Sequence, residues 1–367
     1  MAAQLLFARY APKTLEPENA IGAKWERLLD RLGLARTVKG RRVAVKMHLG
    51  GDRGFSTIHP FFVRRLVGKL KEAGAAEVFV TDMPGNVREA VNRGYTSETL
   101  GCAILPVAGS ADKYFYTRKI APPFRTLNEV HLAGEVMDAD VLVDLAHVKG
   151  HGACAFGGAS KNLSMGAVTG ATRTDLHRLE GGLDWSKAKC THCRKCVENC
   201  PNRAMSFTEA GELEIFFHHC KYCQHCVLIC PQHAIRIAGG RYKDFQQGMA
   251  RATAAILDGF RPNRALFINL LMDITVWCDC WGMTTPQLVP DIGILAGRDI
   301  VAIEQATLDL IRADDLIPGS LPAGWKLHGR KGAHLFERIH SKDPYEIVRA
   351  LAALGAGAPE YRLIEVE

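Results

Sequence analysis

Short apolar runs alternate with segments of helical periodicity along most of the chain. Residues 41–47 form an apolar run that ends in charge, and a glycine-bearing loop separates it from residues 59–73, whose apolar positions recur at helical spacing. A second strand is expected at 77–81, with a helix from Val87 onward. Further strands are expected at 140–145, 265–271 and 291–296, and further helices near 126–137, at 242–260 and at 298–313. This alternation predicts an α/β fold, with a mostly parallel sheet and flanking helices on both faces.

The composition changes abruptly between Trp185 and about Ala238. Eight of the twelve cysteines fall between Cys190 and Cys230, in two copies of one pattern. The segment MSFTEAGELEIFF between the copies, with a turn at 209–212, predicts a hairpin. We therefore expect an α/β domain made of residues 1–185 and 239–367, and an inserted module at 186–238.

Both copies have the spacing Cys-x-x-Cys-x-x-Cys-x-x-x-Cys-Pro. Three thiolates of such a run can wrap one face of an iron–sulfur cubane, while the fourth cysteine, displaced by a short helical turn and the following proline, reaches the other cluster. The first [4Fe-4S] cluster should bind Cys190, Cys193, Cys196 and Cys230, and the second should bind Cys220, Cys223, Cys226 and Cys200. Structural zinc sites also use CxxC pairs, but they have no use for the third and fourth cysteines at these spacings twice over. The module at 186–238 resembles the bacterial two-[4Fe-4S] ferredoxins over its whole length, which implies an inserted ferredoxin-like α+β module.

Charge and cysteine usage narrow the class of protein. The chain has 46 Lys and Arg against 39 Asp and Glu, a formal net charge of +7, but no run of five or more basic residues of the kind that binds nucleic acid. Two clusters of formal charge about −2 each would offset part of this surplus. Cysteines crowded this tightly favour metal binding in a reducing compartment over disulfides.

No membrane span or secretory signal is expected. The longest apolar stretch, residues 265–278, is interrupted by Asn269 and Asp273 and is shorter than the roughly 20 residues that cross a bilayer. The basic residues of the N-terminal segment MAAQLLFARYAPK follow a short apolar run, whereas a secretory signal places them before a longer one. A cytoplasmic protein is therefore expected.

Polar residues follow each predicted strand, where open α/β sheets bind their ligands. They are His48 after the first strand, Asp82 after the second, His147, Lys149 and His151 after the third, and Asp273, Cys278 and Cys280 after the strand at 265–271. Each has an ordinary alternative, such as a satisfied loop histidine, or a helix N-cap in the case of Asp82. The convergence of all these loops favours a site for a substrate or a metal.

The glycine-rich stretch at 150–162 precedes a predicted helix. Its backbone amides and Lys161 could bind an anion, or its glycines could let the loop pack closely against the insert. It contains no GK[ST] at the spacing of a phosphate-binding loop, and no GxGxxG follows a strand, so nucleotide binding is not indicated.

Four cysteines lie outside the two runs. Cys278 and Cys280 form a CxC pair that could bind a metal, act as a redox couple, or be two small buried residues. With His48, His147 or His151 nearby, the pair would suit an additional zinc, copper or iron ion. Cys102 lies in an apolar run and is expected in the core. For Cys154 the sequence leaves open whether it is a core residue or a site residue.

From about residue 41 to residue 315 the chain resembles the domain-of-unknown-function 362 family, in its branch with an inserted two-cluster ferredoxin. The resemblance rests on the two cysteine runs and on VKMHLGG, VTDMPGN, VLVDLAHVKGHGACAFGGASKNLSMG, VWCDCWG and VPDIGILAGRDIVAIEQATLDLI. It implies a redox-active iron–sulfur protein of unassigned substrate.

Together these features favour an oxygen-sensitive oxidoreductase. Its insert would relay electrons between an external carrier, such as a ferredoxin or flavodoxin, and a small-molecule site in the α/β domain. The residues expected to bind substrate or a further metal and to manage protons are His48, Asp82, His147, His151, Lys161, Asp273, Cys278 and Cys280. The alternative is a non-catalytic electron-transfer or metallocentre-assembly protein. A cavity at the strand ends favours the enzyme, and a flat apolar surface there favours the alternative.

Overall fold

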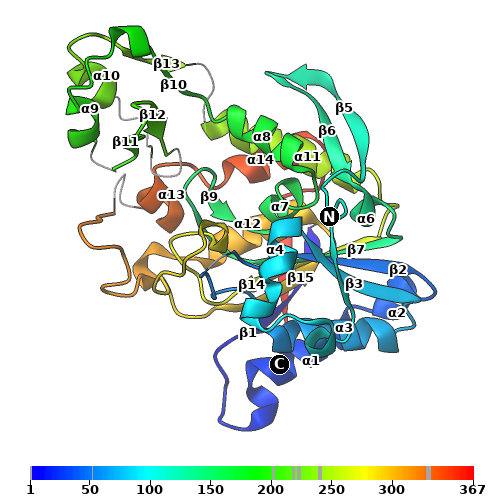
Figure 1. Cartoon of the computed structure of the whole chain (residues 1–367). Helices are drawn as coiled ribbons and strands as arrows, with labels where there is room; N and C mark the ends of the chain where they lie inside the picture. The colour runs from blue at the N-terminus through cyan, green and yellow to red at the C-terminus, as the bar shows by residue number, and fades with distance from the viewer. Residues whose placement is uncertain are drawn as a thin grey trace.

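An eight-stranded mixed sheet forms the centre of the protein (Figure 1). The computed structural model describes residues 2–51, 53–200, 203–216, 220, 225–238, 242–327 and 332–367. In spatial order the strands are β16 (Tyr361–Glu365), β1 (Ala3–Arg9), β15 (Gly293–Gly297), β14 (Ala265–Leu271), β7 (Val141–His147), β2 (Arg42–Met47), β3 (Glu77–Asp82) and β4 (Ala103–Pro106). Of these strands β15 alone is reversed, since it pairs antiparallel with both β1 and β14. The predicted α/β class and mostly parallel sheet are confirmed.

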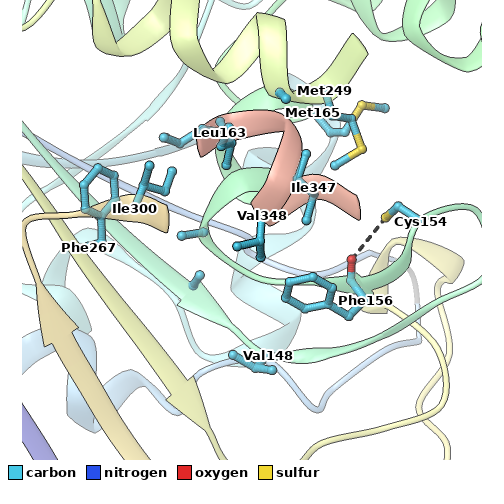
Figure 2. Close-up of a cluster of buried hydrophobic side chains, with 14 of the residues drawn as sticks. Val148, Cys154, Phe156, Leu163, Met165, Met249, Phe267, Ile300, Ile347 and Val348 are labelled. Atoms are coloured by element: carbon cyan, nitrogen blue, oxygen red, sulfur yellow. Dashed lines mark hydrogen bonds between the residues drawn. The ribbon is translucent and has the colours of Figure 1, made fainter. Parts of the chain in front are cut away.

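Helices cover both faces of this sheet (Figure 1). One face packs on α1 (Ile21–Arg31), α2 (Leu34–Val38) and α3 (Pro60–Glu72), and the other on α7 (Ala159–Ser164), α11 (Tyr242–Leu257), α12 (Ile300–Leu310) and α14 (Glu346–Ala353). Successive residues of β14 enter opposite cores: Ile268 packs on the first side, and Phe267 packs on the second. Figure 2 shows part of the second core, including Phe267 and Ile300. Burial on both faces explains why the central strands are mostly apolar instead of alternating between apolar and polar residues.

The predicted helix near 126–137 was wrong. Residues there form β6 (Leu127–Ala133), which pairs antiparallel with β5 (Phe115–Phe124), and the helix is confined to α6 (Gly134–Met137). Leu127, Val130 and Leu132 are buried in the core, and cross-strand pairing with β5 satisfies their backbone. Tertiary packing therefore overrides a weak local helical pattern.

Small elements occupy the cysteine-rich segment. Strand β10 (Gly182–Trp185) pairs antiparallel with β13 (Ile235–Ala238), so the chain enters and leaves the segment side by side. Between them lie η3 (Lys187–Lys189), α9 (Lys195–Glu198), β11 (Met205–Phe207), β12 (Leu213–Ile215) and α10 (His225–Ile229). The predicted hairpin is confirmed, because β11 pairs with β12. Cys223, a predicted cluster ligand, lies outside the described residues.

The other elements are short. They are η1 (Pro17–Asn19), α4 (Pro84–Glu89), η2 (Ala90–Arg93), α5 (Ser97–Leu100), β8 (Lys149–His151), β9 (Ala155–Gly157), α8 (Gly170–Arg178), η4 (Asp279–Trp281), η5 (Ala313–Asp315) and α13 (Leu335–His340). Among the described residues, no helix combines the length and the apolar character that crossing a bilayer requires.

Candidate functional site

A cavity of about 120 Å³ lies at the carboxyl ends of β2 and β3, beside the segment that follows β7. Helices α7 and α8 complete its wall, through Lys161 and Asn162 on α7 and Arg173 and His177 on α8. Five of the eight residues predicted for the α/β-domain site line this cavity: His48, Asp82, His151, Lys161 and Cys280. The carboxyl ends of parallel strands therefore bring together residues that are far apart in sequence.

Asp82 is the centre of a buried polar network. Its carboxylate lies 3.0 Å from Nζ of Lys46 and 3.2 Å from Nδ1 of His48, and it accepts hydrogen bonds from the Leu49 amide and the Asn86 side chain. Burial alone would raise the pKa of Asp82, but the Lys46 ammonium and His48 hold it well below its ordinary value. Asp82 is thus ionised and fixes the position of the His48 ring.

The CxC pair lies beside Lys161. Nζ of Lys161 is 3.3 Å from Sγ of Cys278 and 3.8 Å from Sγ of Cys280. Cys278 is buried and Cys280 is exposed. Burial alone would raise the pKa of Cys278, but Cys280 and the Lys161 ammonium hold it well below its ordinary value. The interaction with Cys278 raises the pKa of Cys280, so the pair holds one thiolate, on Cys278, and one thiol, on Cys280.

His151 faces this pair through one ring nitrogen. Its Nε2 lies 3.9 Å from Sγ of Cys280, and its Nδ1 accepts a hydrogen bond from the Ala153 amide at 3.1 Å. Because Nδ1 accepts, the neutral ring carries its hydrogen on Nε2. His151 can therefore donate a hydrogen bond toward the sulfur of Cys280.

The same three side chains can hold a metal ion. One ligand atom from each of His151, Cys278 and Cys280 lies within 4.8 Å of the others. Two thiolates and an imidazole suit zinc, copper or iron. Such an ion would have to displace the hydrogen on Nε2 of His151 and compete with the Lys161 ammonium for the two sulfurs.

His147 and Asp273 lie outside the cavity wall. Nδ1 of His147 is 3.2 Å from the Asp279 carboxylate, and its Nε2 is 3.0 Å from the carbonyl oxygen of Met272. Both ring nitrogens are thus engaged in holding the loop that carries the CxC pair. The Asp273 amide donates to Asp291, and Asp273 has a left-handed backbone with φ of 50°. In this position His147 and Asp273 shape the loop around the cavity.

The glycine-rich stretch packs tightly against the α/β domain. A Cβ added to Gly150 would lie 2.3 Å from the carbonyl oxygen of Val276, and one added to Gly158 would lie 2.4 Å from Oε1 of Glu304. These two glycines therefore permit close approach to the loop after β14 and to α12. Cys154 in the same stretch belongs to the core, where its thiol donates to the Phe156 carbonyl oxygen (Figure 2). Burial raises the pKa of Cys154 to about 12, so it stays a thiol.

Five further polar residues line the cavity: Lys46, Lys149, Asn162, Arg173 and His177. Lys149 follows a predicted strand but was not among the expected site residues. Lys46 was not expected either, although a charged residue within an apolar strand is a sequence signal that could have identified it. Arg173 and His177 are one turn apart on α8, so they share a helix face. The sequence gives no indication of which helix covers the strand ends.

Four cysteines from both runs line a second cavity, in the cysteine-rich segment. They are Cys190, Cys193, Cys196 and Cys230, and Trp185 of β10 is part of the same wall. Backbone amides donate to sulfur at matching places in the two runs: Ala204 to Cys200 at 3.2 Å, and Ala234 to Cys230 at 3.3 Å. Hydrogen bonds of this kind stabilise thiolates, so these sulfurs fit the role of metal ligands.

A family model described as Domain of unknown function (DUF362) matches residues 43–309. No curated protein matches the chain. One similar solved structure is the lactate racemase apoprotein from Thermoanaerobacterium thermosaccharolyticum, with 11% identity, a TM-score of 0.33, and coverage of 74% of this chain and 50% of that one. Another is a protein from Thermotoga maritima, with 14% identity, a TM-score of 0.36, and coverage of 70% and 52%. The chain thus spans about half the length of each.

Proposed function

The chain belongs to the DUF362 family, whose description assigns no activity, and we propose that it is an iron–sulfur oxidoreductase. Residues 186–238 would hold two [4Fe-4S] clusters and receive electrons from an external carrier such as a ferredoxin or flavodoxin. The cavity at the strand ends would bind a small-molecule substrate. Bound clusters of this type supply one-electron transfer.

The main support for the proposal is that Cys230 lies together with Cys190, Cys193 and Cys196. These four residues line one cavity although Cys230 belongs to the second run. Crossed ligation of two cubanes requires this exchange of the fourth cysteine. A zinc site built from each CxxC pair separately would not need it.

The chain connects the two cavities over a short distance in sequence. His177 of α8 lines the cavity at the strand ends, and Trp185 of β10 lines the cavity that contains Cys190. Only seven residues separate them in the chain. The proposed electron path leads from the cysteine-rich segment to the cavity that this stretch of chain joins to it.

The groups in the cavity suit proton and charge management. The exposed Cys280 carries a thiol hydrogen beside the Cys278 thiolate, and His151 carries a hydrogen on Nε2 toward the same sulfur. In the same cavity, the ionised Asp82 orients His48, which also interacts with Cys278. Two hydrogen-carrying groups in an open cavity favour a substrate-converting site over a flat partner-binding surface.

Anaerobic metal analysis tests the proposal. The purified full-length protein should contain about eight irons and eight sulfides per chain, and dithionite should produce the electron paramagnetic resonance signals of reduced [4Fe-4S] clusters. The control is Cys102→Ala, which removes a core cysteine outside both runs and should keep the iron content. Stoichiometric zinc with no iron would refute the proposal.

A further inference from the structure

The cavity at the strand ends carries more positive than negative charge. Four cationic side chains line it, and they are Lys46, Lys149, Lys161 and Arg173. Asp82 is the one carboxylate among the described lining residues, and it is already paired with Lys46. Such a surplus attracts anions strongly, because the surrounding protein screens charge less than water does.

Lys149 is a buried cation of this cavity. Its side chain is 4% exposed, and its ammonium group donates to the His147 carbonyl oxygen at 2.8 Å. No carboxylate of the described residues lies within ion-pair distance of Lys149. Asp279 and Cys278 act on Lys149 electrostatically without an ion-pair contact, and Lys161 is the closer partner of Cys278. Because none of these groups is in ion-pair contact with the buried Lys149 ammonium, an anion in the cavity would stabilise it.

Arg173 offers a fork of donors on the α8 side. Its Nη1 donates to the Val168 carbonyl oxygen at 2.8 Å, which is the guanidinium's one hydrogen bond to the described residues. Its Nη2 lies 3.7 Å from the Asp112 carboxylate, and that same oxygen already accepts from the Gly170 amide at 2.6 Å. The guanidinium therefore keeps donors for a planar two-point contact with an oxyanion.

We infer that this cavity binds a compact oxyanion, the carboxylate or phosphate group of a small substrate, through Arg173 and Lys149. The inference rests on the proposed function and deepens it, since it names the substrate class of the same site. A volume of about 120 Å³ admits a molecule of a few heavy atoms and is too small for a dinucleotide. Cys280 lines the same cavity, so the remainder of the substrate lies next to its thiol.

Calorimetric titration of the anaerobically purified full-length protein tests this inference. The probes are malonate, inorganic phosphate and the uncharged malonamide. At least one anion should bind, with an affinity that falls as salt rises, and malonamide should not bind. Arg173→Gln and Lys149→Gln should each weaken anion binding by about tenfold or more. The control Arg178→Gln alters an exposed residue of the same helix, paired with Asp175, and should stay within about twofold of wild type.

Each outcome decides a separate point. Tighter binding of malonate identifies a carboxylate site, and tighter binding of phosphate identifies a phosphate site. Neither anion binding better than malonamide, or both cavity variants binding like wild type, would overturn the inference. Thermal melting identifies a misfolded variant. If one variant misfolds, the other still tests the inference, because Arg173 and Lys149 lie on different elements. The readout needs neither iron nor electron transfer, so iron-free protein that binds anions would refute only the proposed function.

Discussion

The ammonium nitrogen of Lys161 lies 3.3 Å from the Sγ of Cys278. Lys161 comes from α7 and Cys278 from the loop after β14, so the contact joins segments 117 residues apart. A cation at this distance favours the thiolate over the thiol. The contact therefore keeps the buried Cys278 sulfur in its charged form within the α/β domain, apart from the two cysteine runs.

Replacing Lys161 by Met should slow alkylation of the CxC pair. Without the ammonium group the pKa of the thiols rises, and each unit by which a pKa exceeds the assay pH lowers the thiolate fraction about tenfold. Iodoacetamide labelling at pH 7, followed by mass spectrometry of the peptide that contains Cys278 and Cys280, measures the rate. Lys161→Arg keeps the charge and should react more like wild type. Equal rates in wild type and Lys161→Met would show that the ion pair does not activate the sulfur.

The crossed ligand sets predict which cysteines become reactive when one ligand is lost. In Cys230→Ala about half of the iron should be lost, and Cys190, Cys193 and Cys196 should become open to alkylation, because they share a cavity with Cys230. In Cys200→Ala the newly reactive cysteines should instead be those of the second run. Iron analysis with peptide-resolved labelling distinguishes the two patterns. Exposure of Cys190 by Cys200→Ala would contradict crossed ligation.

The central strands could be predicted from sequence, and the edges of the sheet could not. Strands β2, β7 and β14 are buried on both faces, so each appears as a mostly apolar run with one polar residue inside it: Lys46, Asp144 and Asn269. β1 and β16 went unrecognised, because β16 has no fully buried residue and acquires its strand form by pairing with β1. The 126–137 segment was misassigned because its apolar spacing fits a helix nearly as well as a hairpin strand.

The residues of the candidate site also differ in whether the sequence predicts them. His48 and Asp82 could be predicted because His48 directly follows β2 and Asp82 is the last residue of β3, and the ends of these parallel strands meet at one edge of the sheet. Arg173 and His177 reach the cavity only because α8 packs across those ends, a tertiary contact without a local signal. His147 follows the same strand rule, but its ring bonds to Asp279 and the main chain. Position at the end of a strand thus predicts that a residue lies near the site. Whether its side chain lines the cavity depends on the direction in which that side chain points.

The cysteine-rich segment should be removable without unfolding the α/β domain. Trp185 of β10 lies opposite Ile235 of β13, so a two-residue Asn-Gly turn can join them as a hairpin in place of residues 186–234. The shortened protein should remain soluble, melt cooperatively and contain no iron. Circular dichroism melting and iron analysis measure these properties. An insoluble product would show that the segment is needed for the fold. The control for the inserted turn sequence keeps the segment and replaces residues 209–210, at the β11–β12 turn, by the same Asn-Gly dipeptide.

The buried Glu304 should make the free energy of unfolding fall as pH rises. Its carboxyl group on α12 is 1% exposed, and Oε1 accepts hydrogen bonds from the Ala159 amide at 2.7 Å and from Asn269 at 3.3 Å. Burial raises the pKa of Glu304 from 4.5 to about 7. The folded state therefore binds a proton more tightly than the unfolded state. This stabilisation is fully present below pH 4.5 and is lost as pH rises to about 7.

Glu304→Gln isolates this contribution. The amide keeps an oxygen for the Ala159 amide but carries no charge, so the variant should gain stability over wild type as pH rises, by about 3 kcal/mol at pH 8 relative to pH 4.5. Urea unfolding at several pH values measures the difference between the two proteins, in which the other titrating groups cancel. Glu360→Gln, at an exposed position, should show no such trend. A constant difference between Glu304→Gln and wild type from pH 5 to pH 8 would mean that Glu304 ionises in the folded protein as easily as in the unfolded chain.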